Sequence, residues 1–424
     1  MIYFELNREK TEIGKAELKE GLYAALQKIG VKKRVIVVPP DITRYHSQAG
    51  ILTSYVYEYF KAGLVDILPA LGTHAPMSSQ EIQKMYPGIP ESLFRIHDWR
   101  KDIVVVGTVP GEFVESITEG ALYYNWPAQL NKIIWEGNHD LILSVGQVVP
   151  HEVVGMANYN KNLFVGTGGA EAINKSHFIG AVYGMERLLG RPDNPVRELL
   201  NYASNKFILH LPVIYVLTVV ALNNEGNPVV KGLFIGDDSD VFYKASELSL
   251  NVNFNMLDKP LGKVIVYLDP EEYKSLWLGN KSIYRTRMAL ADNGELIVLG
   301  PGLKGFGEDS EIDRLIKIYG YSGKKKILEY TEQNAELRNN LSAAAHLVHG
   351  STEGRFNVTY CPGKLSREEI ESVSFQYADL KKMIKHYNPE RLKPGFNIMP
   401  DGEEIYFIQN PALGLWAYKE RFYK

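Results

Sequence analysis

Short apolar runs that alternate with amphipathic segments are the feature that most restricts the fold of this 424-residue chain. Segments 16–30 and 49–63 carry apolar residues at helical spacing, and each is followed by an apolar run. The apolar runs of the first part of the chain are 34–38, 65–71, 103–106 and 141–146. Runs that are apolar throughout are typical of strands buried on both faces, so their alternation with helices predicts an α/β fold with a doubly wound sheet.

A second α/β series follows a loop-like stretch at 251–262. Its candidate strands are 263–268 and 296–299, and its candidate helices are 309–320, 366–375 and 379–387. We therefore predict two α/β domains, residues 1–260 and 261–424, with a cofactor and substrate cleft between them. The final segment, about 397–424, alternates as β-structure does, and its return to the first domain is left open.

Composition restricts the partners and the cellular compartment. The net charge of −3 gives no reason to expect binding to nucleic acid or to an anionic membrane. Cys361 is the one cysteine, which excludes an internal disulfide and thiolate zinc clusters and fits a reducing cytoplasm. The most apolar stretch, 207–222, is too short to span a bilayer and contains His210 and Pro212, so we predict buried strand structure there. The N-terminus lacks the pattern of a signal peptide, and we expect a soluble cytoplasmic protein.

Reactive side chains follow the ends of several predicted strands. The sequence Asp41-Ile42-Thr43-Arg44 comes after the first run, Gly72-Thr73-His74 after the second, and His151 after the fourth. Ligands of doubly wound sheets bind beyond the carboxyl ends of the strands. These residues are therefore expected to converge, although Asp41 and Arg44 also fit a plain local ion pair.

The stretch 150–177 contains further reactive side chains. Lys161 lies ten residues after His151 in an Asn-rich stretch that we expect to be a loop, and His177 lies sixteen residues later. Between them, the turn 166–169 precedes a predicted helix that begins near Ala170, and backbone N–H groups at such a position bind phosphate. We predict a site for a phosphorylated cofactor that includes Gly168 and Gly169. The alternatives are a helix cap without a ligand and a solvated loop lysine.

In order and spacing, these elements resemble the nickel-pincer lactate racemase family, which carries Asp-x-Thr-Arg, Gly-x-His, Pro-His, a lysine and a further histidine. The resemblance implies a cofactor, the nickel-pincer nucleotide, Ni(II)-pyridinium-3,5-bisthiocarboxylic acid mononucleotide, tethered through a thioamide to Lys161. It implies that His177 is the nickel ligand and that His74 and His151 are the acid/base catalysts. Phosphate or cofactor contacts fall on the segment 41–44.

The implied reaction is inversion of a 2-hydroxy acid at C2, by a racemase or epimerase. Removal of a proton from that carbon would form a costly dianionic enolate, whereas removal of a hydride leaves a neutral ketone. The cofactor supplies the electron chemistry, and a histidine takes the hydroxyl proton. The implied partners are a small 2-hydroxy acid and the enzymes that build the cofactor.

One element departs from the family pattern. Where the family has Tyr-Gln-x-x-Lys at its substrate site, this chain has Tyr284, Arg285 and Met288 at the three fixed positions. Arg285 still offers a cation for the carboxylate, but the rest of the pocket must differ. We predict a substrate larger than lactate, such as a sugar acid in an aldonate 2-epimerase, with further polar contacts from groups such as Asn158, Tyr159 or Arg287.

Other functions remain open at this point. The chain is alternatively a lactate racemase itself, a zinc-dependent hydrolase that uses His74, His151 and His177, or a non-enzymatic protein that binds a phosphorylated metabolite. His346 and His349 have one-turn spacing on a predicted helix, but no third metal ligand is evident beside them.

Overall fold

The computed structural model describes residues 1–223, 225–411 and 414–423. Unit 1 comprises Met1–Tyr183 and Arg187–Asn253, and unit 2 comprises Gly184–Glu186 and Phe254–Lys424. The division thus falls between helix α10 (Ser239–Asn253) and strand β11 (Phe254–Leu257), a few residues before the boundary expected at residue 260.

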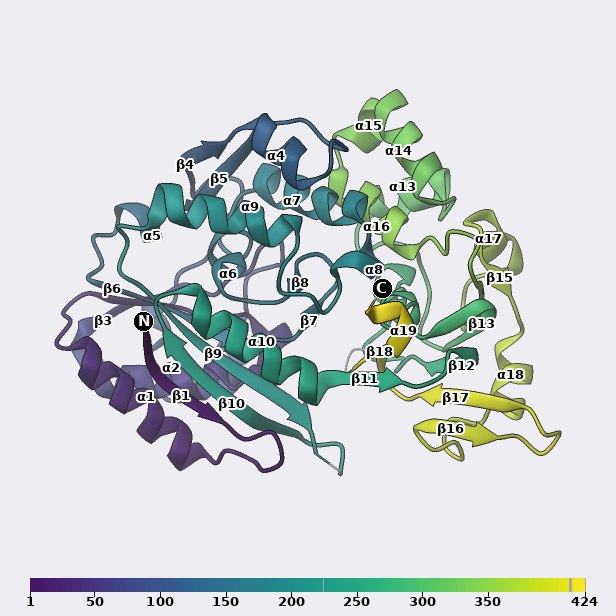
Figure 1. Cartoon of the computed structure of the whole chain (residues 1–424), viewed down its shortest axis with the longest axis horizontal. Helices are drawn as coiled ribbons and strands as arrows, with labels where there is room; N and C mark the ends of the chain where they lie inside the picture. Colours follow the sequence, from purple (N-terminus) through teal and green to yellow (C-terminus); the bar gives the residue numbers. More distant parts are fainter. Residues whose placement is uncertain (224, 412–413, 424) are drawn as a thin grey trace. The chain divides into compact units, whose positions relative to one another are not determined.

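Unit 1 is built on a six-stranded sheet with the order β1-β10-β9-β6-β2-β3 (Figure 1). Pairing is parallel between β2 and β3, β2 and β6, and β6 and β9, whereas β10 pairs antiparallel with β9 and with β1. The predicted α/β class is confirmed, and the antiparallel edge was not anticipated. The strands are β1 (Ile2–Asn7), β2 (Val35–Val38), β3 (Leu64–Ile67), β6 (Leu141–Gln147), β9 (Val213–Leu222) and β10 (Pro228–Gly236).

Helices cover both faces of this sheet. Along β2, Val35 and Val37 join an apolar core with α1 and α2, and Ile36 and Val38 join the opposite core with α6, α7, α9 and α10. This alternation explains why the strand is apolar throughout. The helices of the first part of the chain are α1 (Lys15–Ile29), η1 (Ile42–Ser47), α2 (Ala49–Phe60), η2 (Lys61–Gly63), α3 (Ser79–Met85), η3 (Glu91–Leu93), α4 (Gly111–Ile117), α5 (Lys132–Glu136), α6 (Asn160–Phe164), α7 (Ala170–Tyr183), α8 (Met185–Leu188), α9 (Pro195–Ala203), η4 (Ser204–Ile208) and α10 (Ser239–Asn253).

One predicted run lies outside the main sheet. Strand β4 (Ile103–Val109) pairs only with β5 (Trp126–Asn131) in a separate antiparallel ribbon. Val105 is half exposed, so this run is apolar without being buried on both faces. A second small ribbon joins β7 (Pro150–His151) to β8 (Gly155–Met156).

The most apolar stretch of the sequence forms strand structure as predicted, since β9 occupies most of it and is largely buried. Residues 207–208 belong instead to the π-helical turn η4 that precedes the strand. Within the described part of the chain, no helix combines the length and the apolar character that crossing a bilayer requires.

Unit 2 contains a second six-stranded sheet, with the order β15-β14-β13-β12-β17-β16. Its pairs are parallel except for β16 with β17, and β11 pairs with β18 in a separate parallel ribbon. The final segment therefore stays in unit 2, because β17 pairs with β12 and β18 pairs with β11. The strands are β11 (Phe254–Leu257), β12 (Leu261–Tyr267), β13 (Leu290–Gly300), β14 (Asn357–Pro362), β15 (Gln376–Tyr377), β16 (Gly395–Ile398), β17 (Glu404–Ile408) and β18 (Leu415–Tyr418).

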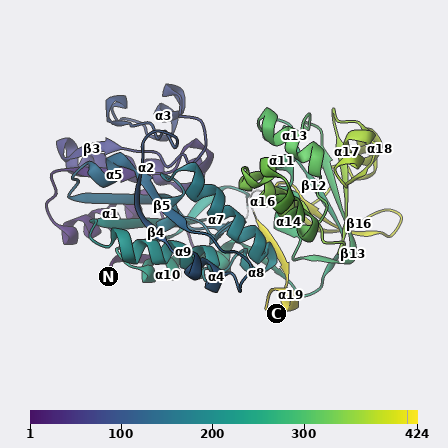
Figure 2. The same ribbon diagram turned by 90° about the horizontal axis from the view of Figure 1, so that it is seen from above.

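The unit 2 sheet is also buried on both faces. Ile297 and Leu299 of β13 join a core with α18, and the alternating Leu296 and Val298 are equally buried on the other face. Figure 2 shows α16 and α18 on opposite sides of this sheet. The helices are α11 (Leu276–Gly279), α12 (Lys281–Thr286), α13 (Ser310–Tyr319), α14 (Lys324–Gln333), α15 (Ala335–Arg338), α16 (Leu341–Gly350), α17 (Arg367–Ser372), α18 (Leu380–His386) and α19 (Lys419–Phe422).

Gly50, in α2 of unit 1, provides a test of the packing of α2 against α3. A Cβ added at Gly50 would lie 1.9 Å from the carbonyl oxygen of Met85. Alanine favours helix over glycine by up to about 1 kcal/mol, but the backbone clash outweighs that gain. We expect Gly50→Ala to lower the free energy of unfolding by about 1–3 kcal/mol, measured by urea denaturation.

The matched control is Gly262→Ala, since a Cβ at Gly262 meets no heavy atom within 4 Å. This variant is expected to stay within about 0.5 kcal/mol of the parent protein. A Gly50→Ala protein as stable as the parent would contradict the packing of α2 against the end of α3.

Candidate active site

The candidate site of unit 1 lies where three neighbouring parallel strands end. The order β6-β2-β3 brings the carboxyl ends of these strands to one edge of the sheet. Asp41 follows β2, His74 follows β3, and His151 follows β6. The structure joins two of them directly, because Nδ1 of His74 lies 2.6 Å from Oδ2 of Asp41.

Asp41 begins the turn η1 and is almost fully buried. Its Oδ1 accepts a hydrogen bond from the backbone N–H of Thr43 at 3.1 Å. Burial raises the pKa of the Asp41 carboxyl group, but the hydrogen bonds from His74 and Thr43 outweigh burial and leave the pKa below its usual value. Asp41 is therefore a carboxylate near neutral pH, while Thr43 and Arg44 beside it are exposed to solvent.

The hydrogen bond to Asp41 determines the tautomer of His74. A carboxylate only accepts hydrogen bonds, so Nδ1 of His74 carries the proton and donates it to Asp41. In the neutral ring, Nε2 then has a free lone pair. The His74 side chain is 58% exposed, so a ligand has access to this base.

His151 is held in the opposite tautomer. Its Nδ1 accepts a hydrogen bond from the backbone N–H of Val153 at 3.1 Å, so the neutral ring carries its proton on Nε2. Burial lowers the pKa of His151 well below its usual value, and the positive charge of Lys161 adds to this effect. The resting protein thus presents a lone pair at Nε2 of His74 and an N–H group at Nε2 of His151.

His177, on α7, has the arrangement that is common among histidines that bind metals. Its Nδ1 donates a hydrogen bond to the carbonyl oxygen of Ile173 at 2.7 Å, which leaves the lone pair of Nε2 available. Burial, followed by the charge of Lys161, lowers the pKa of His177 to about 4. The ring is therefore neutral at physiological pH, the form that binds a metal ion.

Lys161 lies in the short helix α6, so the expectation of a loop at this position was wrong. The helix is anchored at the strand ends, because Nδ2 of Asn162 donates to the carbonyl oxygen of Val38 at 2.9 Å and to Oγ of Ser144 at 3.0 Å. Burial lowers the pKa of Lys161 to about 8, and the charge of Arg44 is the next contribution. A sizeable fraction of this amine is therefore neutral and nucleophilic near pH 7.5.

The glycine-rich turn between α6 and α7 packs tightly against protein atoms. A Cβ at Gly168 would lie 1.9 Å from the carbonyl oxygen of Phe164, and one at Gly169 would lie 2.6 Å from Oε1 of Gln129. The same Oε1 atom accepts a hydrogen bond from the backbone N–H of Ala172, in the first turn of α7. These contacts support the alternative of a helix cap, and phosphate binding at Gly168 and Gly169 stays a prediction.

Several other histidines have structural partners. In unit 1, His97 lies between the side chain of Asn131 and the carbonyl oxygen of Gly168, and His139 pairs with Asp66 at 2.9 Å. Within the residues that the structure describes, no group of three or more histidine, cysteine, aspartate or glutamate side chains is placed to hold a metal ion.

In unit 2, His346 lies 2.7 Å from the hydroxyl oxygen of Tyr284 through Nδ1 and 2.9 Å from that of Tyr321 through Nε2. Its neighbour His349 contributes its carbonyl oxygen to Arg287 at 2.9 Å. Both ring nitrogens of His346 thus face tyrosine hydroxyl groups, rather than a metal site shared with His349.

The residues predicted to bind substrate lie on and just after α12, in unit 2. Arg285 and Met288 are buried. Arg287 forms an ion pair with Glu186 at 3.1 Å, so its guanidinium group already has a structural role. Among the additional polar groups predicted for the substrate, Tyr159 packs into the apolar core of unit 1 and Arg287 is engaged with Glu186.

Sequence reasoning missed Arg197, a buried residue of α9 that contacts the segment before Lys161. The available signal was the spacing of Asn194, Arg197 and Asn201, which places three polar residues on one face of a helix.

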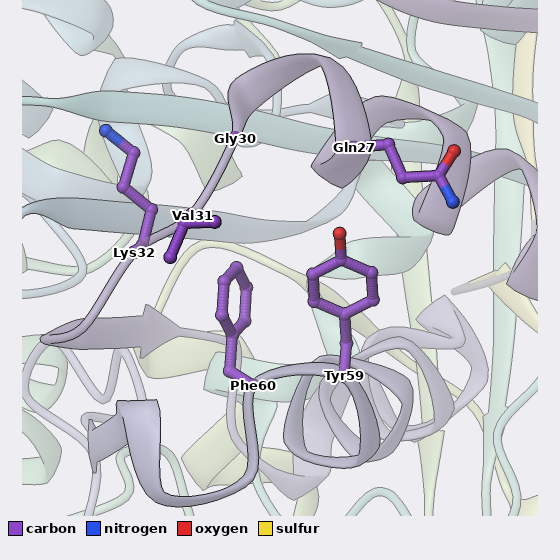
Figure 3. Close-up of a pocket in the computed structure, with 6 residues that line it drawn as sticks. All are labelled: Gln27, Gly30, Val31, Lys32, Tyr59 and Phe60. Atoms are coloured by element: carbon purple, nitrogen blue, oxygen red, sulfur yellow. The ribbon is translucent and has the colours of Figure 1, made fainter.

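A pocket of ≈ 410 Å³ lies at the opposite edge of the unit 1 sheet (Figure 3). Its residues immediately precede β2 and β3, at the amino ends of these strands, whereas Asp41 and His74 follow their carboxyl ends. The pocket is therefore separate from the candidate site. Its lining residues are Gln27, Gly30, Val31, Lys32, Tyr59 and Phe60.

Comparisons with known proteins show what this chain resembles. Residues 7–187 match the lactate racemase N-terminal domain. Lactate racemase from Thermoanaerobacterium thermosaccharolyticum is 24% identical over 291 residues, which cover 65% of this chain and 62% of that protein. The matched region thus spans less than two thirds of that relative.

Two solved structures share the fold. A protein from Thermotoga maritima has a TM-score of 0.79 and 24% identity, covering 98% of this chain and 100% of that one. The lactate racemase apoprotein from Thermoanaerobacterium thermosaccharolyticum has a TM-score of 0.68 and 17% identity, covering 98% of this chain and 94% of that one. The resemblance predicted from the motifs is confirmed by the match of residues 7–187 to the lactate racemase N-terminal domain and by the lactate racemase relative.

Proposed function

We propose that this protein is an isomerase that inverts C2 of a 2-hydroxy acid with a nickel-pincer nucleotide tethered to Lys161. The proposal is carried by two nitrogen groups of unit 1. Burial lowers the pKa of the Lys161 amine to about 8, and the neutral ring of His177 has the lone pair of Nε2 available. Both helices that carry these side chains lie in the same unit as the Asp41–His74 pair. The match of residues 7–187 to the lactate racemase N-terminal domain supports the reaction class.

The donor set fits such a cofactor. The described residues offer no cluster of three protein ligands, so a metal ion at His177 would need its other ligands from a bound organic group. Lys161 would hold that group covalently, and His177 would supply the protein's ligand to the metal. When bound, the cofactor would supply the acceptor for the substrate hydride.

The protein groups would handle the proton and the substrate. His74 would take the hydroxyl proton at Nε2, and the Asp41 carboxylate would stabilise the imidazolium that forms. His151, the second member of the acid/base pair, would begin by donating its Nε2–H to the substrate oxygen, and would need to give up the bond from Val153 to act as a base. Segment 41–44 would contact the cofactor, chiefly through the exposed Thr43 and Arg44.

The substrate is proposed to be larger than lactate. Arg285 is proposed to bind the substrate carboxylate, because it occupies the position of the substrate-contacting glutamine in the family pattern. The presence of Arg285 and Met288, in place of the glutamine and lysine of the family pattern, supports a sugar acid rather than lactate. Lactate racemisation is the second candidate, since the relative that matches is a lactate racemase.

The zinc hydrolase hypothesis has less support. A catalytic zinc ion usually has three protein ligands, and His74, His151 and His177 do not form such a group in the described residues. In addition, the neutral ring of His151 carries its proton on Nε2 while Nδ1 accepts from Val153, so this ring offers no lone pair to a zinc ion.

Replacement of the tether tests the cofactor assignment. We expect Lys161→Ala, produced together with the cofactor-building enzymes, to lack the nucleotide-sized mass adduct and the bound nickel that the parent protein carries. Intact-protein mass spectrometry and metal analysis measure both. Lys101→Ala is the matched control, because the Lys101 side chain is 82% exposed and the variant should load normally. An adduct that persists in Lys161→Ala would refute the tether.

Replacement of the carboxylate tests the proton-transfer assignment. Asp41→Asn removes the charge that orients His74 and stabilises its protonated form, so we expect kcat, expressed per bound nickel, to fall by at least about 100-fold. Rates of inversion of chiral 2-hydroxy acids, sugar acids first, measure the effect. A loaded Asp41→Asn enzyme with a kcat close to that of the parent would show that the Asp41–His74 pair does not carry the proton.

A further inference from the structure

Arg197 is a cation buried without a carboxylate partner. Its residue is 1% exposed, and none of the ion pairs in the described part of the chain includes it. The guanidinium group lies 4.2 Å from the ring centroid of Phe242, in a cation–π contact. Burial of an arginine charge costs free energy, so we expect Arg197 to have a role beyond packing.

In the described part of the chain, the side-chain hydrogen bonds of Arg197 all go to one short segment. Nη2 donates to the carbonyl oxygen of Met156 at 2.7 Å, and Nη1 donates to the carbonyl oxygen of Asn158 at 3.3 Å and to the side-chain oxygen of Asn160. A planar fork with several donors can reach these oxygens together, whereas the single ammonium group of a lysine cannot. Lys161 is the next residue along the chain.

Other residues on the same face of α9 contact the same segment. Nδ2 of Asn194 donates to the carbonyl oxygen of Val154 at 3.1 Å. Nδ2 of Asn160 donates to Oδ1 of Asn201 at 2.7 Å and to Oγ of Ser204 at 3.2 Å. The residues of this face follow one another at intervals of three or four, so the helix holds the segment 154–160 along its length.

The segment needs to be held, because its backbone is strained. Asn158 and Tyr159 both have left-handed φ angles, of 66° and 59°, and Tyr159 is a bulky residue for which this region is unfavourable. Such conformations persist only where the surrounding structure fixes them, and they concentrate at functional sites. The strained turn ends where α6 begins, so it determines the direction in which Lys161 leaves the backbone.

We propose that Arg197 is a positioning residue that fixes the left-handed turn at Asn158 and Tyr159 and thereby orients the Lys161 amine for its covalent bond. The use of the amine as a tether rests on the proposed function, whereas the orientation and reactivity of the amine do not. The charge of Arg197 supports the same role, since it is one of the groups that lower the pKa of Lys161, after burial and Arg44.

The groups that act on Lys161 come from several elements. Arg44 and Arg197 oppose its protonation, Glu152 and Asp41 favour it, and the neutral rings of His151 and His177 respond to its charge. Loss of Arg197 would remove one positive charge and would also release the turn. Both changes raise the pH at which Lys161 becomes reactive.

The test measures the amine in the cofactor-free protein. Acetic anhydride acetylates a neutral amine, with acetate as the leaving group and the amine proton passing to solvent. Competitive acetylation across a pH series, followed by peptide mass spectrometry, gives the midpoint and rate for Lys161, with Lys101 and Lys175 as internal references. In the parent protein we expect a Lys161 midpoint near 8.

Arg197→Met should move the Lys161 midpoint upward by at least one pH unit and leave the reference lysines unchanged. Arg197→Lys keeps a positive charge but loses the fork, so its midpoint should lie between those of the parent and Arg197→Met. Production with the cofactor-building enzymes should give at least tenfold less mass adduct in both variants. Arg187→Met is the control, because Arg187 is half exposed and pairs with Glu119 at the surface.

The outcomes separate this inference from the proposed function. A folded Arg197→Met protein with the parent midpoint and the parent adduct level would overturn the positioning role. If Arg197→Met fails to fold, a parent midpoint and adduct level in Arg197→Lys would overturn the role equally. A raised midpoint in the variants, combined with no adduct even on the parent protein, would support the positioning role and reject the tether.

Discussion

The parallel pairing of β2 with both β3 and β6 is the constraint on which the candidate site depends. It makes three separate chain segments leave the sheet at one edge, and it places Asp41 within hydrogen-bonding distance of His74, thirty-three positions later. Asn162 ties α6 to the same strand ends through the carbonyl oxygen of Val38 and the hydroxyl of Ser144. Because these contacts are made to a buried sheet, the functional groups stand on a rigid base rather than on mobile loops.

The charge distribution around this edge favours neutral nitrogen bases. Arg44 and Lys161 contribute positive charge among buried imidazoles, and Asp41 and Glu152 offset it only in part. The pKa values of His151, His177 and Lys161 are all lowered, with burial as the largest cause in each case. Metal binding, proton acceptance and nucleophilic attack all need the neutral form of a nitrogen, so one electrostatic environment would serve all three of the proposed roles.

The sequence predicts the central strands, because a strand buried on both faces must be apolar throughout. It also predicts the polar residues that follow these strands, because ligands of such sheets bind beyond the carboxyl ends of the strands. Strand β4 shows the limit of that argument, since its apolar run pairs outside the main sheet. The β1 and β10 edge, like the placement of Lys161 in a helix, depends on contacts with distant residues that local patterns do not encode. The partners of Arg197 are hidden for the same reason: its spacing with Asn194 and Asn201 marks a polar helix face, but only the fold shows that these partners are carbonyl oxygens and an amide.

The opposite tautomers of His74 and His151 have a consequence for stereochemistry. A hydroxyl group that approaches His74 meets a lone pair, and one that approaches His151 meets an N–H group. If the protein acts on a hydroxy acid as proposed, the resting site would distinguish the two mirror-image orientations of that substrate before any reaction begins. The distinction would rest on two ordinary contacts, one to a buried carboxylate and one from a backbone amide.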